Sequence, residues 1–288
     1  MITIENESLK VTMRTKGAEL TSIYNKITGT EQLWQADPAV WAWHAPNLFP
    51  IVGGVLNDEL LVDGKTYPMP KHGFGRHSEY ILLESSDVHA VFSLPNSEHT
   101  LQAYPYKFDF QVIYTLIDNA LRVTYKVINH DDKTIHFSVG GHPAFRVPFL
   151  EGEKYEDYYV EFETEEPLTR HLISKNGYFD GRTESVPMKG NRIYLTGDIF
   201  NDDALIFKNI SSKLVSIKSD NHDKSISVEF PHFNHLGIWA KPKANFVCIE
   251  PWLGYTDTEG EPHDISKKDA IQHLKLGHTF EAAFFISI

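Results

Sequence analysis

The sequence predicts an all-β protein, a large antiparallel β-sandwich with a few short helices. Three observations lead to this class: apolar residues recur with a period of two, turn residues separate the apolar runs, and helical stretches are few. No internal repeat and no Gly/Ser linker interrupts the 288 residues. We therefore expect one continuous domain over residues 1–288.

The expected strands follow one another along the whole chain. The clearest are 107–116 and 120–129, because alternate residues of each run are apolar and the loop 117–119 joins them as a hairpin. In chain order, the same reasoning predicts strands at 8–14, 80–85, 89–94, 107–116, 120–129, 135–140, 157–164, 213–219, 224–230 and 279–288. Short helices are expected at 38–43 and 266–274.

Composition narrows the class of protein. The formal net charge of −12 argues against a nucleic-acid partner, because phosphate binding needs clustered Lys and Arg. The N-terminus has no secretory pattern, no stretch is apolar enough to span a membrane, and the single cysteine, Cys248, excludes an intrachain disulfide. We expect a cytoplasmic protein in which Cys248 is an inert packed residue.

Three stretches combine polar groups with Gly, Pro and aromatic residues: 70–80, 139–148 and 248–257. In the second, His142 follows Gly140 and Gly141, which permit unusual backbone angles, and precedes Pro143, which fixes the exit. A backbone restricted in this way holds the imidazole in a fixed position, and a histidine can transfer protons near neutral pH. A purely structural histidine is the alternative interpretation.

In the third stretch, Glu250 follows an apolar run and precedes Trp252. A carboxylate at the end of a buried strand is costly unless it is paired or functional. Partial burial raises the pKa of such a carboxyl group toward that of a useful general base. The alternative is a glutamate that forms a salt bridge at the end of the strand.

The first stretch contains 72-HGFGR-76. Arg76 offers several donors to hydroxyl groups or to an anion, and Phe74 and Trp252 have the apolar rings that stack on a sugar. His72 lies at the other end of the same turn. Alternatively, Arg76 forms an ion pair with Glu79 or with another acidic residue.

Several other chemistries lack their motifs. The sequence contains no H-E-x-x-H, no cysteine metal pattern, no phosphate-binding P-loop and no G-x-S-x-G elbow. The histidine pair of 232–235 falls in a strand or turn, so we expect no metal site there.

Taken together, the stretches resemble the aldose 1-epimerase (galactose mutarotase) family, and within it the LacX-like branch. The motifs are spread over nearly the whole chain: 48-LFPIVGG-54, 61-LVDGKTYPMPKHGFGR-76, GGHPAF, CIEPW and 276-LGHTF-280. The resemblance implies a galactose mutarotase-like supersandwich that needs no organic cofactor and no catalytic metal. In one position the chain departs from the family, because Gly54 stands where relatives usually have an arginine that reaches the sugar.

The resemblance also implies roles for individual residues. His142 would be the general acid and Glu250 the general base, while His72 contacts the sugar, Arg76 lines the pocket and Asp203 binds sugar hydroxyls. The implied reaction interconverts the α and β anomers of an aldose or aldose phosphate through ring opening.

Two other functions stay open. The first is a non-catalytic carbohydrate-binding protein on the same fold, and the second is a glycoside hydrolase that pairs Glu250 with Asp203 or Asp257. In each case the partner is a small sugar, with neither nucleic acid nor a membrane. Both a monomer and a homodimer agree with the sequence.

Overall fold

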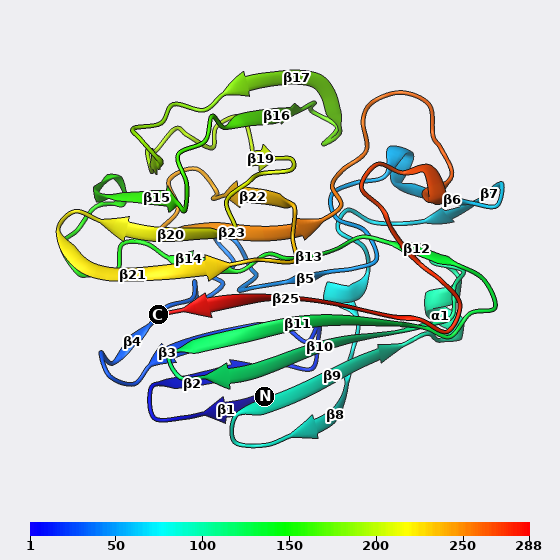
Figure 1. Ribbon diagram of the computed structural model, residues 1–288, viewed down its shortest axis with the longest axis horizontal. Coiled ribbons are helices and arrows are strands. Elements are labelled where there is room, and N and C mark those ends of the chain that lie inside the picture. The colour runs from blue at the N-terminus through cyan, green and yellow to red at the C-terminus, as the bar shows by residue number, and fades with distance from the viewer.

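The computed structural model describes residues 1–288, and two large antiparallel sheets dominate it (Figure 1). The larger sheet has nine strands, in the order β18 (Arg192–Tyr194), β15 (Tyr158–Phe162), β20 (Leu214–Ser219), β21 (His222–Glu229), β25 (Thr279–Ser287), β11 (Ala120–Asn129), β10 (Phe108–Ile117), β9 (His89–Pro95) and β8 (Ile81–Ser85). The second sheet has the order β19 (Leu205–Phe207), β22 (His235–Trp239), β23 (Phe246–Leu253), β13 (Val139–Gly141) and β5 (Asn47–Leu48), with β14 (Ala144–Arg146) also paired to β23.

Smaller elements extend these two sheets. A four-stranded sheet contains β1 (Ile2–Glu5), β2 (Leu9–Met13), β3 (Leu20–Asn25) and β4 (Thr30–Glu31). Three strand pairs complete the β structure: β6 (Glu59–Val62) with β7 (Lys65–Pro68), β12 (Ile135–Phe137) with β24 (Gln272–Leu274), and β16 (Thr169–Ile173) with β17 (Phe179–Ser185). The helical elements are α1 (Glu98–Leu101) and the 3₁₀ turns η1 (Leu56–Asp58), η2 (Gly75–His77), η3 (Tyr155–Asp157) and η4 (Ile265–Lys267).

The two large sheets pack face to face through aromatic side chains. In Figure 1, β23, β13 and β5 lie between the β16–β17 hairpin and strands β25, β11 and β10 of the larger sheet. Phe49, which follows β5, stacks on Phe110 of β10 with ring centroids 4.2 Å apart. The apolar cluster at this interface contains 68 buried residues. Burial alternates strictly along most of β10, as a period of two requires for a strand with one face in a core.

These sheets confirm the predicted all-β class, and nine of the ten predicted strands appear within a few residues of their expected limits. The strand expected at 135–140 is instead two strands, β12 and β13, because the chain leaves one sheet and enters another at Ser138. The short helix α1 is not predicted from the sequence. The reciprocal contacts between Ser97 and Thr100 cap its start.

Both predicted helices are wrong. Residues 38–43 form a turn and an irregular segment, since six residues rarely sustain a helix and Trp41 instead packs against Phe246. Residues 266–274 contain only the end of η4 and then β24. There, the chain turns to bury Lys268 against Asp257 before it pairs with β12.

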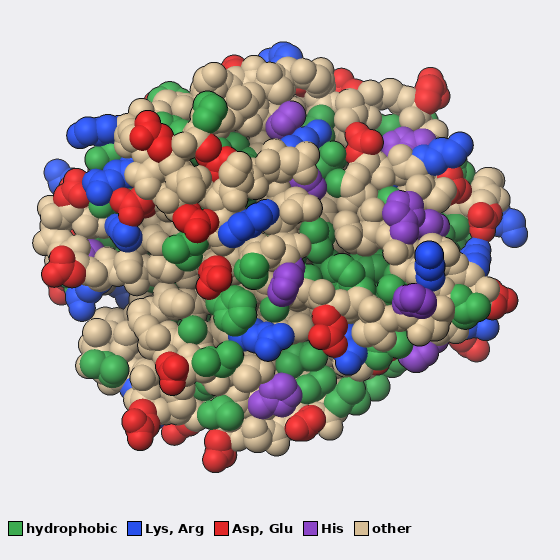
Figure 2. Space-filling view, viewed as in Figure 1, with side chains coloured by type: hydrophobic (Ala, Val, Ile, Leu, Met, Phe, Trp, Pro, Cys, Tyr) green, Lys and Arg blue, Asp and Glu red, His purple; other side chains and the backbone are tan.

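Acidic and basic side chains are interspersed over the face shown in Figure 2, without a large block of one sign. Histidines gather on the right of this view, the side on which Figure 1 places β6 and β12. No helix is both long and apolar enough to cross a membrane.

Candidate active site

His142 and Glu250 face each other because of the strand register around them. Gly140 pairs with Trp252, and Ala144 pairs with Cys248, so the same register continues on both sides of His142. Residue 142 is therefore opposite residue 250, and opposite residues of antiparallel strands project to the same face. The proposed acid and base, more than a hundred residues apart in sequence, are cross-strand neighbours.

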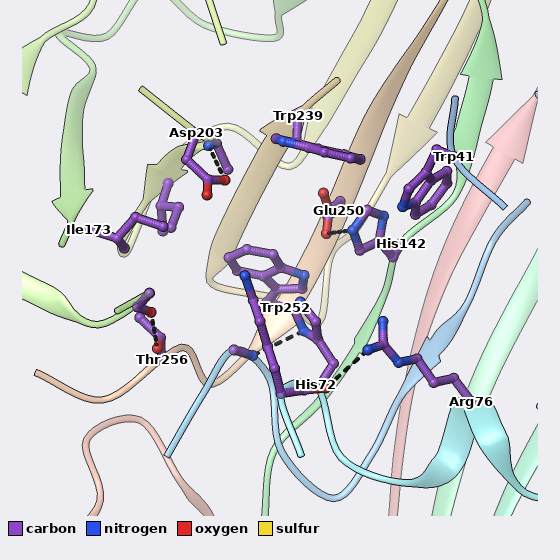
Figure 3. A pocket seen from close by; sticks show the side chains of 15 residues that line it. Trp41, His72, Arg76, His142, Ile173, Asp203, Trp239, Glu250, Trp252 and Thr256 are labelled. Atoms are coloured by element: carbon purple, nitrogen blue, oxygen red, sulfur yellow. Dashed lines mark hydrogen bonds and ion pairs between the residues drawn. The ribbon is translucent and has the colours of Figure 1, made fainter. Parts of the chain in front are cut away.

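The Nε2 atom of His142 lies 3.3 Å from Oε2 of Glu250. Figure 3 marks this contact with a dashed line. Both side chains are buried, with 8% of His142 and 1% of Glu250 exposed. Burial lowers the pKa of His142 to about 3 and raises that of Glu250 well above its usual value. Burial therefore favours the neutral form of each group and disfavours any state that leaves a net charge on the pair.

The sequence suggested that Glu250 lies at the end of a strand, and this expectation is wrong. It lies in the middle of β23, whose eight residues are all buried. Apart from the contact with His142 Nε2, no donor reaches its Oε2 atom, and the Nδ1 atom of His142 and the Nε1 atom of Trp252 lack hydrogen-bond partners. Buried polar atoms without partners are rare in proteins, and these three belong to side chains that line one cleft.

Gly140 and Gly141 are required for close packing, and the prediction that they permit unusual backbone angles is wrong. Neither Gly140 nor Gly141 has a positive φ angle, so unusual backbone angles are not the reason for them. A Cβ atom on Gly140 would lie 2.5 Å from the ring of Trp252, and one on Gly141 would lie 2.9 Å from the ring of Phe284. Close packing of aromatic rings against the strand therefore requires glycine at both positions.

Aromatic rings enclose the imidazole of His142. Trp41 stacks on it with centroids 5.0 Å apart and planes 27° apart, and Trp239 approaches it edge-on at 5.8 Å. Phe246 supports the other side of Trp41 at 5.4 Å. Three of the chain's five tryptophans, Trp41, Trp239 and Trp252, line the cleft.

The segment after β7 forms the basic wall of the cleft, with Lys71, His72 and Arg76. His72 is fixed by two backbone contacts with Gly53: its N–H donates to the Gly53 carbonyl at 2.7 Å, and its Nδ1 accepts from the Gly53 N–H at 3.1 Å. The imidazole proton of neutral His72 is therefore on Nε2. Burial holds the pKa of His72 well below its usual value, so this donor is uncharged.

Arg76 forms no ion pair with Glu79, because Glu79 instead accepts a hydrogen bond from Thr15. The guanidinium of Arg76 donates through Nη2 to the Lys71 carbonyl and through Nε to His77, each at 3.2 Å. Its remaining donors are available to the cleft that it lines (Figure 3).

The opposite wall comes from two turns. Asp203 precedes β19, and its Oδ1 accepts from the N–H of Ala204 at 2.7 Å. Gly177 lies in the turn between β16 and β17, and Thr256 donates to its carbonyl at 2.8 Å. Asp203 and the β16–β17 turn thus face His72 and Arg76 across the cleft (Figure 3).

Two residues predicted from the sequence lie elsewhere. Phe74 does not line the cleft; its ring packs into the core against Phe49 and Phe108, each at 6.3 Å, so the stacking role predicted for it is wrong. Asp257 binds the buried ammonium of Lys268 and the N–H of Leu56. The carboxylate of Asp257 thus stabilises the loop behind the cleft, and Glu250 is not paired with it.

The tertiary structure shows what surrounds Gly54, the position at which the family resemblance leads us to expect an arginine. The ring of Tyr178 covers this position, and a Cβ atom on Gly54 would lie 3.1 Å from that ring. Tyr178 in turn donates to the Val55 carbonyl at 3.0 Å. A longer side chain at position 54 would have to displace Tyr178.

Several residues that line the cleft are not predicted from the sequence, notably Trp41, Trp239, Thr256 and Ile173. Trp41 was assigned to a helix, and only its conjunction with Trp239 in space reveals that both enclose His142. The only sequence signal for these residues was the tryptophan side chain itself, which combines a large apolar ring with a polar N–H group.

The cleft encloses about 260 Å³, which is near the lower end of the ~300–1,000 Å³ typical of ligand sites. A cleft of that size with aromatic walls, several hydrogen-bonding groups and a buried proton-sharing pair is typical of a protein that acts on a small polar molecule such as a monosaccharide.

The comparisons agree on a family. The model of the aldose 1-epimerase family matches residues 1–267, and the chain therefore belongs to that family. The Protein LacX sequences of Lactococcus lactis subsp. lactis, plasmid and chromosomal, are 34% identical over 297 residues, which cover 100% of this chain and 99% of each LacX chain.

Two solved structures are close in shape. A galactose mutarotase related enzyme from Lactobacillus acidophilus has a TM-score of 0.94 and 37% identity, covering 99% of this chain and 96% of its own. A galactose mutarotase-like protein from Lactobacillus casei ATCC 334 has a TM-score of 0.94 and 34% identity, covering 100% and 99%. The predicted family and fold are thus confirmed.

Proposed function

We propose that this protein is an aldose 1-epimerase that interconverts the α and β anomers of an aldose or aldose phosphate. The observation that carries the proposal is the buried contact of 3.3 Å between His142 Nε2 and Glu250 Oε2 at the aromatic end of the cleft. Opening a cyclic hemiacetal requires one group that removes the C1 hydroxyl proton and another that protonates the ring oxygen. The pair holds one proton, which is the number that this exchange needs.

In the proposed mechanism, Glu250 removes the proton from the C1 hydroxyl while His142 protonates the ring oxygen. The ring opens to the aldehyde, the C1–C2 bond rotates, and the ring closes with the proton transfers reversed. The pair then returns to its starting protonation state, so no covalent intermediate or external proton donor is required. The cation of Lys71 favours the carboxylate form of Glu250 that accepts the proton.

We assign the rest of the cleft to sugar binding. His72 Nε2 and the free donors of Arg76 suit sugar oxygens, and Asp203 offers an acceptor to hydroxyl groups from the opposite wall. The rings of Trp252 and Trp239 provide apolar faces of the kind that pack against sugar C–H groups. We further propose a single domain that acts in the cytoplasm on a small sugar, as a monomer or homodimer; the cluster of 68 core residues supports the single domain.

Polarimetry of freshly dissolved aldoses and their 6-phosphates tests the proposal. Glu250→Gln and His142→Asn should each lower the rate of mutarotation by roughly 10²–10⁴-fold, the usual contribution of one acid or base. The exposed residues Glu261 and His99 provide matched controls, Glu261→Gln and His99→Asn, which should retain the wild-type rate. Near-normal rates in either cleft variant would exclude the assignment.

A non-catalytic carbohydrate-binding protein is the second candidate, and Gly54 is the observation that favours it. With Tyr178 over Gly54, one donor that relatives direct at the sugar is absent. Three tryptophans in the cleft make sugar binding visible by fluorescence. A sugar that quenches or shifts this emission without any acceleration of anomer exchange would favour the binding protein.

The hydrolase alternative is reduced to one carboxylate pair. Asp257 is bound to Lys268, which leaves Asp203 as the other carboxyl group of the cleft. Release of nitrophenol from aryl glycosides, abolished by Asp203→Asn, would favour hydrolysis over mutarotation.

A further inference from the structure

We propose that the acid–base pair is also an inhibitory site for a thiophilic divalent cation of the zinc class, with Cys248 as the third protein ligand. The proposal rests on the proposed function, because the cation would occupy the place of the sugar. It concerns regulation of the cleft rather than the catalytic reaction, which needs no metal.

The first observation is the proximity of three ligand types. One ligand atom from each of Cys248, His142 and Glu250 lies within 4.8 Å of the other two, and all three side chains are buried. Cys248 and Glu250 are two positions apart on β23, so their side chains project to the same face of the sheet. His142, the cross-strand neighbour of Glu250, projects to this face as well. Thiolate, imidazole and carboxylate are the ligands that zinc prefers, and three protein ligands with an open fourth position are usual when the site is accessible to solvent.

The second observation is the geometry of the pair. Bonds of about 2.0 Å to nitrogen and oxygen place these two atoms about 3.3 Å apart in a tetrahedral zinc site. His142 Nε2 and Glu250 Oε2 are already 3.3 Å apart. With a Zn–S bond of about 2.3 Å, the sulfur must lie about 3.5 Å from the nitrogen. Because the separations do not exceed 4.8 Å, a shift of the Cys248 side chain by about 1 Å completes the set.

The third observation is that a cation would provide a partner for a buried carboxylate oxygen that forms no hydrogen bond. Glu250 Oε2 is buried and has no hydrogen-bond partner. A bound divalent cation would replace the thiol proton of Cys248 and the proton shared by His142 and Glu250. Two protons leave, one thiolate and one carboxylate remain, and their charges cancel that of the cation. A neutral complex is the form that a buried site accommodates at least cost.

The same atoms serve the proposed proton transfers, so the cation and the sugar exclude each other. We therefore expect zinc to inhibit mutarotation competitively: the apparent KM rises with the zinc concentration while kcat is unchanged. Access is through the cleft, which His142 and Glu250 both line.

Cobalt(II) provides a direct test on the full chain, because thiolate coordination gives it a near-ultraviolet charge-transfer band. Cys248 is the only cysteine, so this band reports on this site alone. We expect the chelator-treated, reduced protein to show the band, zinc to abolish it by displacement, and Cys248→Ser to lack it. Loss of the thiolate should also raise the zinc concentration for half-inhibition at least about tenfold, relative to the metal-free rate of each variant.

The control variant addresses the most obvious competing metal site. His136 on β12 and His273 on β24 have their Nδ1 atoms 2.8 Å apart on the surface. His136→Ala should leave both the cobalt band and the zinc inhibition intact. Cys248→Ala serves as a second variant in case Cys248→Ser fails to fold.

Two outcomes would overturn the proposal: absence of the thiolate band in the wild-type protein, or zinc inhibition that is equal in the wild type and the Cys248 variants. The cobalt measurement does not depend on catalysis. If no aldose responds in polarimetry, the proposed function fails, while the band still decides whether the metal site exists.

Discussion

At the scale of single residues, burial determines the chemistry of the cleft. Burial shifts both groups toward their neutral forms, because it lowers the pKa of His142 to about 3 and raises the pKa of Glu250 well above its usual value. The stack of Trp41 on His142 and the edge of Trp239 exclude water from the imidazole. The result is a pair that can exchange a proton with a substrate on each side without a change in its total charge.

A pH profile of mutarotation follows from these shifts. The active pair carries one proton, so activity should fall when a second proton binds, near the His142 pKa of about 3, and when the last proton leaves, above the raised pKa of Glu250. We therefore expect kcat/KM to be flat through pH 6.5, where an unperturbed histidine titrates. Polarimetric rates between pH 5 and pH 8, corrected for the spontaneous reaction, provide the measurement. A clear inflection near pH 6.5 would contradict this account of the pair.

At the scale of elements, one strand organises the site. β23 contributes Cys248, Glu250 and Trp252, and its antiparallel partners β13 and β14 hold His142 opposite Glu250. The loops contribute other polar groups of the cleft, such as His72 and Asp203. This division is common in β-sandwiches, where a rigid sheet positions residues that loops then surround.

The contact between Gly140 and Trp252 predicts a selective effect of Gly140→Ala. The added methyl group would overlap the indole ring, so we expect a loss of about 1–3 kcal/mol in the free energy of unfolding and a lower rate from the displaced ring. Gly197 has an ordinary φ angle and no neighbour closer than 3.7 Å, which makes Gly197→Ala the matched control. Urea denaturation of both variants measures the difference. Equal stabilities would mean that the ring moves aside without cost.

At the scale of the whole molecule, buried histidines make stability depend on pH. Burial lowers the pKa of His142 to about 3 and that of His235 to about 4. Above pH 6.5 each is neutral in both the folded and the unfolded chain, so it adds no pH dependence. Below pH 6.5 the unfolded chain binds protons that the folded chain does not, and the free energy of unfolding falls with decreasing pH.

His235 isolates this effect, because it does not line the cleft. With a pKa of about 4 in the folded state, its contribution between pH 7 and pH 5 is a loss of about 2 kcal/mol. We expect His235→Asn to be less sensitive to acid by about this amount in urea denaturation at the two pH values. Parallel losses in the wild type and the variant would show that His235 does not titrate in this range.

Much of the fold was readable from local pattern. The period of two identified eight of the nine strands of the larger sheet, all except β18. The pattern is clearest in β10 and β11, which have one face in the core and one toward solvent. The same rule failed where burial is two-sided or where strands are short, as with β13, β5 and β22. The prediction of a helix at 38–43 is wrong because Trp41 packs on His142, and a contact between such distant residues leaves no local pattern in the sequence.

The sequence alone determined the all-β class, the family resemblance and the identities of His142, Glu250, His72, Arg76, Asp203 and Trp252 as residues of interest, because these depend on residue types and motif order. Only the tertiary structure decided which of them meet. The register of β13 and β14 on β23 places His142 opposite Glu250. Packing of other segments places Phe74 in the core and Tyr178 over Gly54. Proximity and burial depend on contacts between distant segments, and burial sets the protonation of the pair.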